Sequence, residues 1–271
     1  NAYFPIDRIR NFLSRNKLYG GEYLLASTFG AITPFCSCSS VPLFIGFVKG
    51  GIPMGVTLAF LITSPLVNEV AIAIFIGMFG VKTTLLYAAS GILLGTVGGY
   101  VLGRFRLERF LTPWVQGVIQ QAEMEGAYDG EQNTFAQRLP SVAREALGIV
   151  KSVILYVLIG IGIGALMHGF VPTGFFEKYI SADNPLAVPL AVILGVPMYA
   201  NAAGVLPVIQ VLVQKGVPLG TAIAFMMAVI GLSLPEATLL KKVMTMRLIA
   251  IFFGTVAFFI ILSGYLFNAI L

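Results

Sequence analysis

The sequence predicts an all-α polytopic membrane protein with two internal repeats in opposite orientations, whose proline-broken or re-entrant helices meet near the middle of the membrane. Three observations lead to this prediction: the scarcity of charge, the length of the apolar runs, and a stretch of the first half that returns in the second. Hydrophobic residues make up 58% of the 271 residues and charged residues 11%, with a mean hydropathy of +0.91. Soluble domains carry about 25% charged residues, so this composition excludes an ordinary soluble domain.

Long uncharged runs fit helices that cross a hydrocarbon core of about 30 Å, which needs about 20 apolar residues. These runs are 23–48, 83–103, 152–176, 184–214, 216–235 and 248–271, and the run 52–81 is interrupted only by Glu69. We therefore expect a single helical bundle in the lipid bilayer. Its parts are a first repeat (1–103), a polar cytoplasmic connector (104–145) and a second repeat (146–271).

The stretch 42–60 returns at 207–225. PLFIGFVKGGIPMGVTLAF and PVIQVLVQKGVPLGTAIAF are identical at seven of 19 positions, at an offset of 165 residues, and the shared residues include two prolines and two glycines. On the same offset 4–14 resembles 171–181, but a long apolar run precedes only the second of these stretches. We therefore expect that a first helix of the first repeat is missing before Asn1.

Basic residues indicate the orientation of the bundle. If every long run crosses the membrane once, Lys and Arg divide nine against eight; if one broken run in each repeat is re-entrant, they divide 14 against three. The three are Lys82, Lys178 and Lys215. Because Lys and Arg are enriched on the cytoplasmic side, the second arrangement is favoured, and it inverts one repeat relative to the other. The count leaves open which broken run is re-entrant.

Prolines beside polar residues predict four breaks in the apolar runs, because proline removes a backbone donor and clashes with the preceding turn. The segments are TPFCSCSSVPLF (33–44), ITSPLVNE (62–69), GVPMYANAAGVLP (195–207) and GLSLPEAT (231–238). Breaks at membrane depth are tolerated only where protein or a water-filled cavity satisfies the freed backbone groups. Opposed half-helix ends carry partial charge, so we expect a ligand site where they meet.

Polar and thiol side chains in these breaks are the candidate substrate ligands. They are Cys36, Ser37, Cys38, Asn68, Tyr199 and Asn201. Two cysteines spaced C-x-C rarely have the geometry to bridge each other, so we expect free thiols. The competing role for the small polar residues, and for Asn201 and Tyr199, is helix packing and interhelical hydrogen bonding.

Glu69 and Glu236 are the acids that lie inside apolar regions, and each follows a proline break. A charge at bilayer depth costs at least about 2.5–3.5 kcal/mol. Both are therefore candidates for proton coupling, because a desolvated carboxyl holds its proton more readily. The alternative is a carboxylate stabilised by the positive end of a half-helix.

The stretch TPFCSCSSVPLFIGFVKGGIPMGVTLAFLITSPLVNEVA, with its second-half echo, resembles the predicted-permease family that includes the organoarsenical efflux permeases. The resemblance spans nearly the whole chain, and P-x-C-S-C-x-x-V-P-L followed by T-S-P-L-x-N carries it. It implies a multi-pass permease of the bacterial or archaeal inner membrane and, for the best-known members, export of trivalent organoarsenicals. Cys36 and Cys38 fall on the family's C-S-C positions, and Asn68 and Asn201 on its two asparagines.

We therefore expect a secondary transporter, not an enzyme, that exports a small thiophilic solute by alternating access. Thiolates select soft centres such as trivalent arsenic, so Cys36 and Cys38 are the expected contacts, with no fixed metal and no cofactor. A homo-oligomer or an energising partner stays open, because no ATP-binding motif is present. The alternatives are a permease or channel for a small anion or sulfur species, bound by half-helix N-termini and Asn201, and a thiol redox membrane enzyme. Nucleic acid is not expected, because the basic residues lie at the ends of apolar runs.

Overall fold

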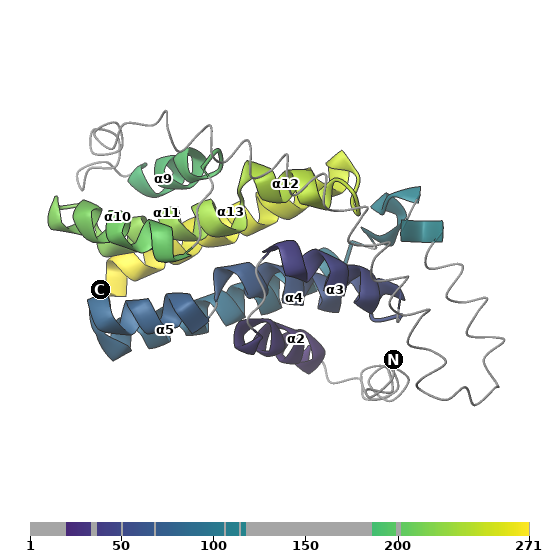
Figure 1. Cartoon of the computed structure of the whole chain (residues 1–271), viewed down its shortest axis with the longest axis horizontal. Helices are drawn as coiled ribbons and strands as arrows, with labels where there is room; N and C mark the ends of the chain where they lie inside the picture. Colours follow the sequence, from purple (N-terminus) through teal and green to yellow (C-terminus); the bar gives the residue numbers. More distant parts are fainter. Residues whose placement is uncertain are drawn as a thin grey trace.

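The computed structural model describes residues 20–33, 37–49, 51–67, 69–105, 107–113, 115–117, 186–198 and 202–270. Within these ranges the chain is helical and has no strand, only an isolated bridge between Leu111 and Met244. The helices lie in two layers, α2 to α5 in one and α9 to α13 in the other (Figure 1). The predicted all-α class is confirmed.

The first layer contains four helices. They are α2 (Gly21–Ile32), α3 (Ser37–Lys49), α4 (Met54–Leu66) and α5 (Glu69–Gly103). Gly80 has φ 81° in the middle of α5, a conformation that glycine adopts readily and other residues do not. It divides α5 into helical segments 69–79 and 81–103.

The second layer follows a short 3-10 helix, η1 (Leu107–Phe110). Its helices are α9 (Ala187–Gly195), α10 (Ala202–Gln214), α11 (Leu219–Gly231), α12 (Leu234–Leu240) and α13 (Met246–Ile270). Helices α10 and α11 begin and end 165 residues after α3 and α4. The connecting turns also correspond, with positive φ at Gly51 and Gly216 and with Pro53 and Pro218 before the next helix.

Helix lengths separate half-helices from spanning helices. The 13 residues of α3, α4, α10 or α11 rise about 20 Å, less than a hydrocarbon core. Three described stretches are long and apolar enough to cross a membrane: Glu69–Arg104, Leu219–Leu240 and Met246–Ile270. The length and composition of these helices indicate that the chain is a membrane protein.

Two of the predicted breaks lie in described backbone. Helix α4 ends at Leu66, and α11 and α12 are separated at residues 232 and 233. Pro65 is the second-last residue of α4, so this helix ends inside the predicted segment 62–69. Pro42 lies inside α3. Proline's fixed φ is itself helical, so Pro42 removes a hydrogen bond without ending the helix. The centres of the other two breaks, 34–36 and 199–201, lie outside the described residues.

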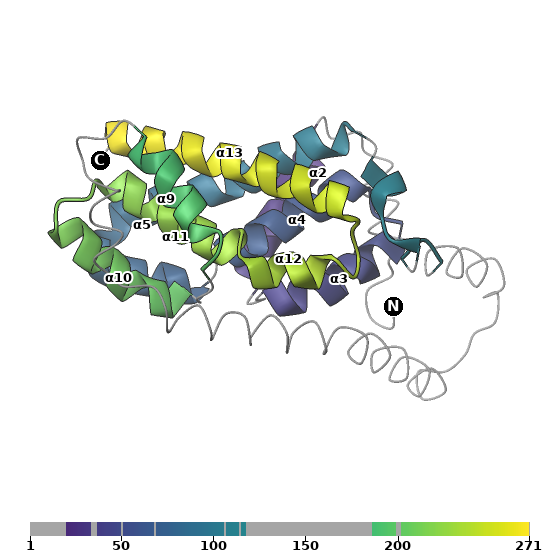
Figure 2. The ribbon, with the colours of Figure 1, turned by 90° about the horizontal axis from the view of Figure 1, so that it is seen from above.

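The second segment of α5 (81–103) and α13 run antiparallel. The chain just after α5 is hydrogen-bonded to the start of α13: Thr245 N–H donates to the Phe110 carbonyl at 3.0 Å. Further along α13, a methyl group placed on Gly98 would lie 4.0 Å from Phe259 Cδ2. Figure 2 accordingly shows the C-terminus at the end of the bundle away from η1.

In the first layer α2 and α4 lie side by side and run in the same direction. A methyl group on Gly30, near the end of α2, would lie 3.0 Å from the Phe60 carbonyl and 3.3 Å from Ser64 N, near the end of α4. One on Gly55, at the start of α4, would lie 3.0 Å from Tyr23, at the start of α2. Helix α3 then returns along α4 to the turn at Gly51.

The same arrangement recurs in the second layer. A methyl group on Gly195, near the end of α9, would lie 3.2 Å from the Phe225 carbonyl and 3.2 Å from Val229 N in α11. Helix α10 then runs back to the turn at Gly216, which precedes α11. In both layers the first broken run therefore forms the hairpin, with α2 and α3 in one layer and α9 and α10 in the other. The count of basic residues had left open which broken run turns back.

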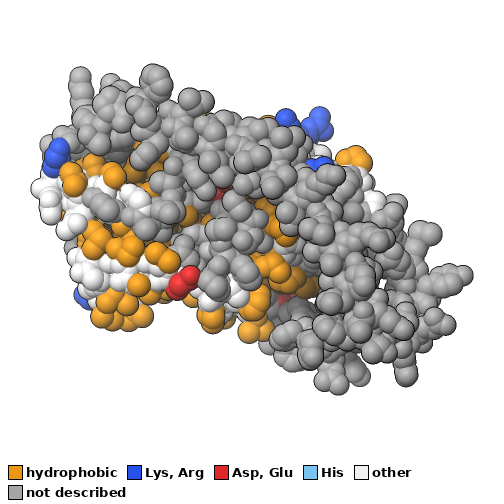
Figure 3. Space-filling view, in the orientation of Figure 1, with side chains coloured by type: hydrophobic (Ala, Val, Ile, Leu, Met, Phe, Trp, Pro, Cys, Tyr) orange, Lys and Arg blue, Asp and Glu red, His pale blue; other side chains and the backbone are white. Residues whose placement is uncertain are grey.

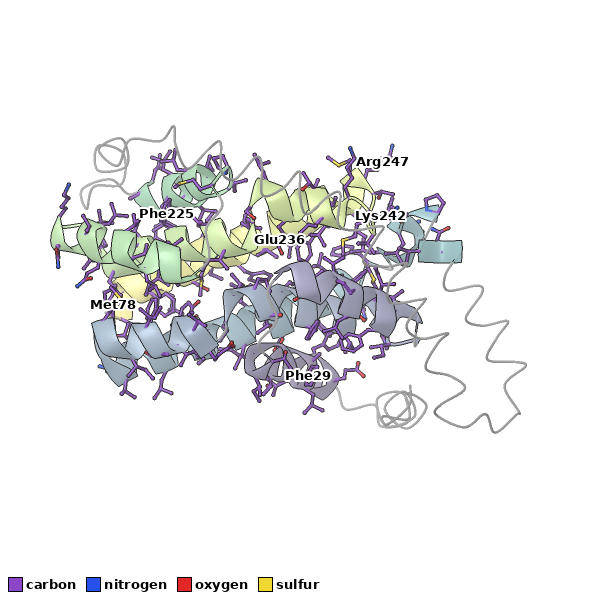
Figure 4. The ribbon with its side chains drawn as sticks, viewed as in Figure 1. Phe29, Met78, Phe225, Glu236, Lys242 and Arg247 are labelled. Atoms are coloured by element: carbon purple, nitrogen blue, oxygen red, sulfur yellow. The ribbon has the colours of Figure 1, made fainter. Side chains whose placement is uncertain are left out.

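Basic side chains lie toward the ends of this bundle. On the face shown in Figure 3, Lys and Arg side chains of the described residues appear at the left end and toward the upper right, and mostly hydrophobic side chains, with an acidic one among them, are visible between. Figure 4 places Met78, next to the Gly80 kink, at the end opposite Lys242 and Arg247. A hydrophobic band between two basic ends is the pattern of a protein that sits in a bilayer.

A glycine-to-alanine pair tests the packing of α4 on α5. In Gly99→Ala the new methyl group would overlap Ala59 Cβ and lie 2.8 Å from its N and Cα, so the helices must separate. We expect a loss of about 1–3 kcal/mol in the free energy of unfolding, measured as thermal stability of the purified protein in detergent. Gly254→Ala in α13 is the matched control, because nothing lies within 4 Å of its added methyl group. Equal effects of the two variants would contradict the packing described here.

Candidate functional site

The ends of the half-helices meet at the centre of the bundle, where the two layers touch. Leu66 is the last residue of α4 and Gly231 the last residue of α11, and a methyl group on Gly231 would lie 2.8 Å from Leu66 Cδ2. These two residues are 165 apart, so equivalent helix ends face each other. We call this region the central junction and define it by Ser40, Ser64, Leu66, Gly231 and Ser233.

Hydrogen bonds hold the breaks of each layer together at the central junction. In the first layer Ser40 Oγ and Ser64 Oγ, both buried, are 2.9 Å apart and join the start of α3 to the end of α4. In the second layer Leu234 N–H donates to the Val196 carbonyl at 3.2 Å, which joins the start of α12 to the chain just after α9. Between the layers α3 packs against α12 and α4 against α11.

Tyr87 caps the broken end of α4. Its hydroxyl, fully buried, donates a hydrogen bond to the Leu66 carbonyl. Its ring stacks on Phe75, with centroids 4.7 Å apart and planes at 10°. Because α4 ends at Leu66, this carbonyl lacks the usual N–H partner four residues on, and the tyrosine replaces it. Tyr87 therefore fixes where the break begins.

Glu236 brings a carboxyl group into this region. It lies in the first turn of α12, and only 3% of its surface is exposed. Ser233 Oγ accepts a hydrogen bond from Glu236 N–H at 3.4 Å, the normal arrangement at a helix start. Glu236 Oε2 has no hydrogen-bond partner in the described part of the chain. Figure 4 shows this residue between the two layers.

The structure separates the two acids that the sequence grouped together. Glu69 begins α5 and its side chain is exposed, whereas Glu236 is buried. On the 165-residue offset Glu236 corresponds to Ala71 and Glu69 to Leu234, so the two acids are not equivalent.

The predicted substrate ligands are placed as follows. Ser37 and Cys38 are the first two residues of α3, which begins beside Ser40 at the central junction. Pro42 cannot donate to the Cys38 carbonyl, so one helical hydrogen bond is missing next to this cysteine. Cys36, Asn68, Tyr199 and Asn201 lie outside the described residues, and their roles stay predictions. Met198 packs partly buried against the core.

Sequence reasoning missed Tyr87. The signal that could have found it is the 165-residue offset, which puts Tyr87 opposite Phe252, a buried ring without a hydroxyl. A buried tyrosine normally has a hydrogen-bond partner, so this difference points to a polar backbone group in the first half. Within the described ranges no group of three His, Cys, Asp or Glu side chains could hold a metal ion.

Comparison with known proteins gives one family and several relatives. A family described as predicted permease matches residues 1–269. The UPF0718 protein MJ0584 of Methanocaldococcus jannaschii is 21% identical over 330 residues, which cover 100% of this chain and 90% of that protein. The UPF0718 protein YcgR of Bacillus subtilis is 26% identical over 156 residues, 55% of this chain and 50% of that protein.

A Streptococcus mutans protein named as a two-component membrane permease complex subunit is 23% identical over 195 residues, 71% of this chain and 61% of that protein. No solved structure matches the chain.

Tyr87→Phe tests the cap on α4. The substitution keeps the stacked ring and removes only the hydroxyl, which leaves the buried Leu66 carbonyl without its donor. We expect a loss of about 1–3 kcal/mol in the free energy of unfolding. Thermal stability in detergent measures it. Tyr100→Phe on the same helix is the control and should change little, because Tyr100 is 53% exposed. Wild-type stability of Tyr87→Phe would show that the cap is dispensable.

Proposed function

The chain belongs to the predicted permease family, and we propose that it exports a small thiophilic solute, such as a trivalent organoarsenical, through a site at the central junction. Its family and its long apolar helices identify the chain as a membrane permease. The observation that carries the proposal is the meeting of the broken ends of α4 and α11, at Leu66 and Gly231, beside the start of α3. Half-helix ends that meet inside a bundle are where transporters bind their substrates.

Thiol chemistry supports the substrate class. Cys36 and Cys38 are the two cysteines of the chain, and thiol sulfur prefers soft centres such as trivalent arsenic. Cys38 lies in the first turn of α3, two residues before Ser40 at the central junction. When a thiol replaces a hydroxyl group on trivalent arsenic, an S–As bond forms, an As–O bond breaks, and the thiol proton leaves with the hydroxide as water. Release reverses this exchange.

We further propose an inverted repeat as the basis of alternating access. Three observations support it: the 165-residue offset between corresponding helices, the antiparallel course of α13 and the segment 81–103 of α5, and the same hairpin in both layers. Lys215 lies in the turn before α11, and Gly220 at the start of α11 packs beside Asn268, at the end of α13. Lys242, in contrast, lies beside the start of α13. This separation agrees with the 14-to-three division of basic residues and favours a cytoplasmic connector.

The relatives support a location and a partner. They are archaeal and bacterial proteins, which favours the cytoplasmic membrane. One relative is named as a subunit of a two-component membrane permease complex. We therefore propose a second membrane subunit as a partner of this chain. That subunit would provide the energy for transport.

A permease for a small anion is the second candidate. Helix α3 begins at the central junction, and helix starts carry N–H groups that bind anions without any thiol. This reading predicts transport that does not depend on either cysteine, so the cysteine variants below separate it from the first.

The orientation is tested by labelling single cysteines in a Cys36→Ser, Cys38→Ser background. We expect Asp129→Cys, in the connector, to react with a membrane-impermeant maleimide only from the cytoplasmic side. Leu271→Cys, at the end of the chain, should react only from the opposite side, because α13 runs away from the connector end of the bundle. Reaction of both from one side would refute the inverted arrangement.

The substrate class is tested by serine substitution. Cys38→Ser should abolish resistance to methylarsenite in an arsenic-sensitive host, and Cys36→Ser should reduce it less, with normal amounts of protein in the membrane. Binding of methylarsenite to the purified protein, measured as bound arsenic after dialysis, should fall in the same order. Unaltered efflux in the double variant would reject the thiol site and leave the anion permease as the better explanation.

A further inference from the structure

The carboxyl group of Glu236 has no described role in holding the fold together. Its surface is 3% exposed, and Oε2 accepts no hydrogen bond from the described residues. Its backbone N–H is the group that caps the helix by donating to Ser233 Oγ, and an alanine at this position could donate equally. The side chain is therefore a buried polar group for which packing gives no reason.

Glu236 lies where three broken segments come together. Its helix starts with the Leu234 N–H bonded to the Val196 carbonyl, after α9, and α12 packs against α3, which starts with Ser37 and Cys38. Figure 4 shows Glu236 in the interior, between the layers. A carboxyl group at this place is next to the segments that must move when the central junction opens to either side.

An ionised carboxylate is unfavourable in these surroundings. Burial of an unpaired charge is costly, and such a group is normally neutral or paired with a cation. The ionisable groups on the elements around it are few: α11 has none, α3 has Cys38 in its first turn and Lys49 at its far end, and Lys241 and Lys242 follow α12. Lys242 lies at the end of the bundle (Figure 4), and no described ion pair includes Glu236.

A proton fits this carboxyl better than a metal cation does. Hard cations in proteins take six or more oxygen ligands, or keep several waters. The described oxygen ligands at this place are the Glu236 carboxyl group and the Ser233 hydroxyl group. No described cluster could hold a metal ion. A proton needs only one oxygen, and Oε2 is an oxygen without a partner among the described residues.

We propose that Glu236 is the proton-binding site of this permease: Oε2 carries a proton while the junction is closed and releases it to water when the junction opens. The proposal rests on the permease function given above. Each cycle takes a proton from the aqueous phase on one side onto Oε2 and returns it on the other. The exchange of cargo at the thiols releases water and no net proton. The proton that is moved in each cycle is therefore the one that Glu236 binds. Glu69 is exposed and is not enclosed by the junction.

The first experiment detects the proton without any cargo. Infrared difference spectra of the full-length purified protein, recorded between neutral and alkaline pH, should show the C=O stretch of a protonated carboxyl in the wild type. We expect Glu236→Gln to lose this band and Glu69→Gln to keep it. Glu236→Asp, which retains a carboxyl, should shift the band, and this variant decides the assignment if Glu236→Gln does not fold. A band that persists in Glu236→Gln, or that is lost in Glu69→Gln, overturns the proposal.

The second experiment measures coupling in proteoliposomes that contain a pH-sensitive dye. In the wild type an imposed pH gradient should accelerate methylarsenite transport about tenfold, with proton movement that depends on methylarsenite. Glu236→Gln should lose both effects and still bind methylarsenite, because both cysteines are intact. Transport driven by a sodium gradient in place of a pH gradient overturns the proposal. If the wild type does not bind methylarsenite, the proposed cargo is wrong, and the infrared result alone decides the role of Glu236.

Discussion

A helix that ends inside a membrane protein leaves backbone groups without helical partners, and the apolar surroundings offer no water to replace them. The contacts at the central junction satisfy this requirement. The Leu66 carbonyl accepts from Tyr87, and the Val196 carbonyl accepts from Leu234 N–H. Each donor comes from a different helical segment than its acceptor. A broken helix is therefore stable only when its neighbours in the same layer are in place.

Close packing of small residues makes this assembly possible. Without a strong hydrophobic drive between helices in lipid, association depends on backbones that approach closely. The start of α4 meets the end of α5 at Gly55 and Gly103, and the start of α11 meets the end of α13 at Gly220 and Gly264. Asn268 adds a polar link there, since its Nδ2 donates to Thr221 Oγ1 at 2.9 Å and its Oδ1 accepts from Thr221 N–H at 3.1 Å.

The two layers share a backbone plan and differ in side chains at the centre. Tyr87 corresponds to Phe252, which has no hydroxyl with which to cap a helix. Glu236 corresponds to Ala71, so this buried carboxyl has no counterpart at the equivalent position of the first layer. A symmetric scaffold can take up two mirrored conformations, and an asymmetric ionisable group then has different surroundings in each. In the mechanism that we propose, this difference would let a proton on Glu236 bias one conformation over the other.

The sequence by itself determined the membrane class and the correspondence of 42–60 with 207–225 at an offset of 165 residues, with its shared glycines and prolines, because hydropathy, glycine and proline act locally. It did not determine the bounds of the half-helices: Pro42 lies inside α3, since a proline within a helix can be tolerated once neighbouring groups compensate. Only the tertiary structure decided that the first broken run of each layer is the hairpin, that Tyr87 caps Leu66, and that Glu236 is buried while Glu69 is exposed. Burial and capping depend on contacts between residues far apart in the chain, and no local pattern carries them.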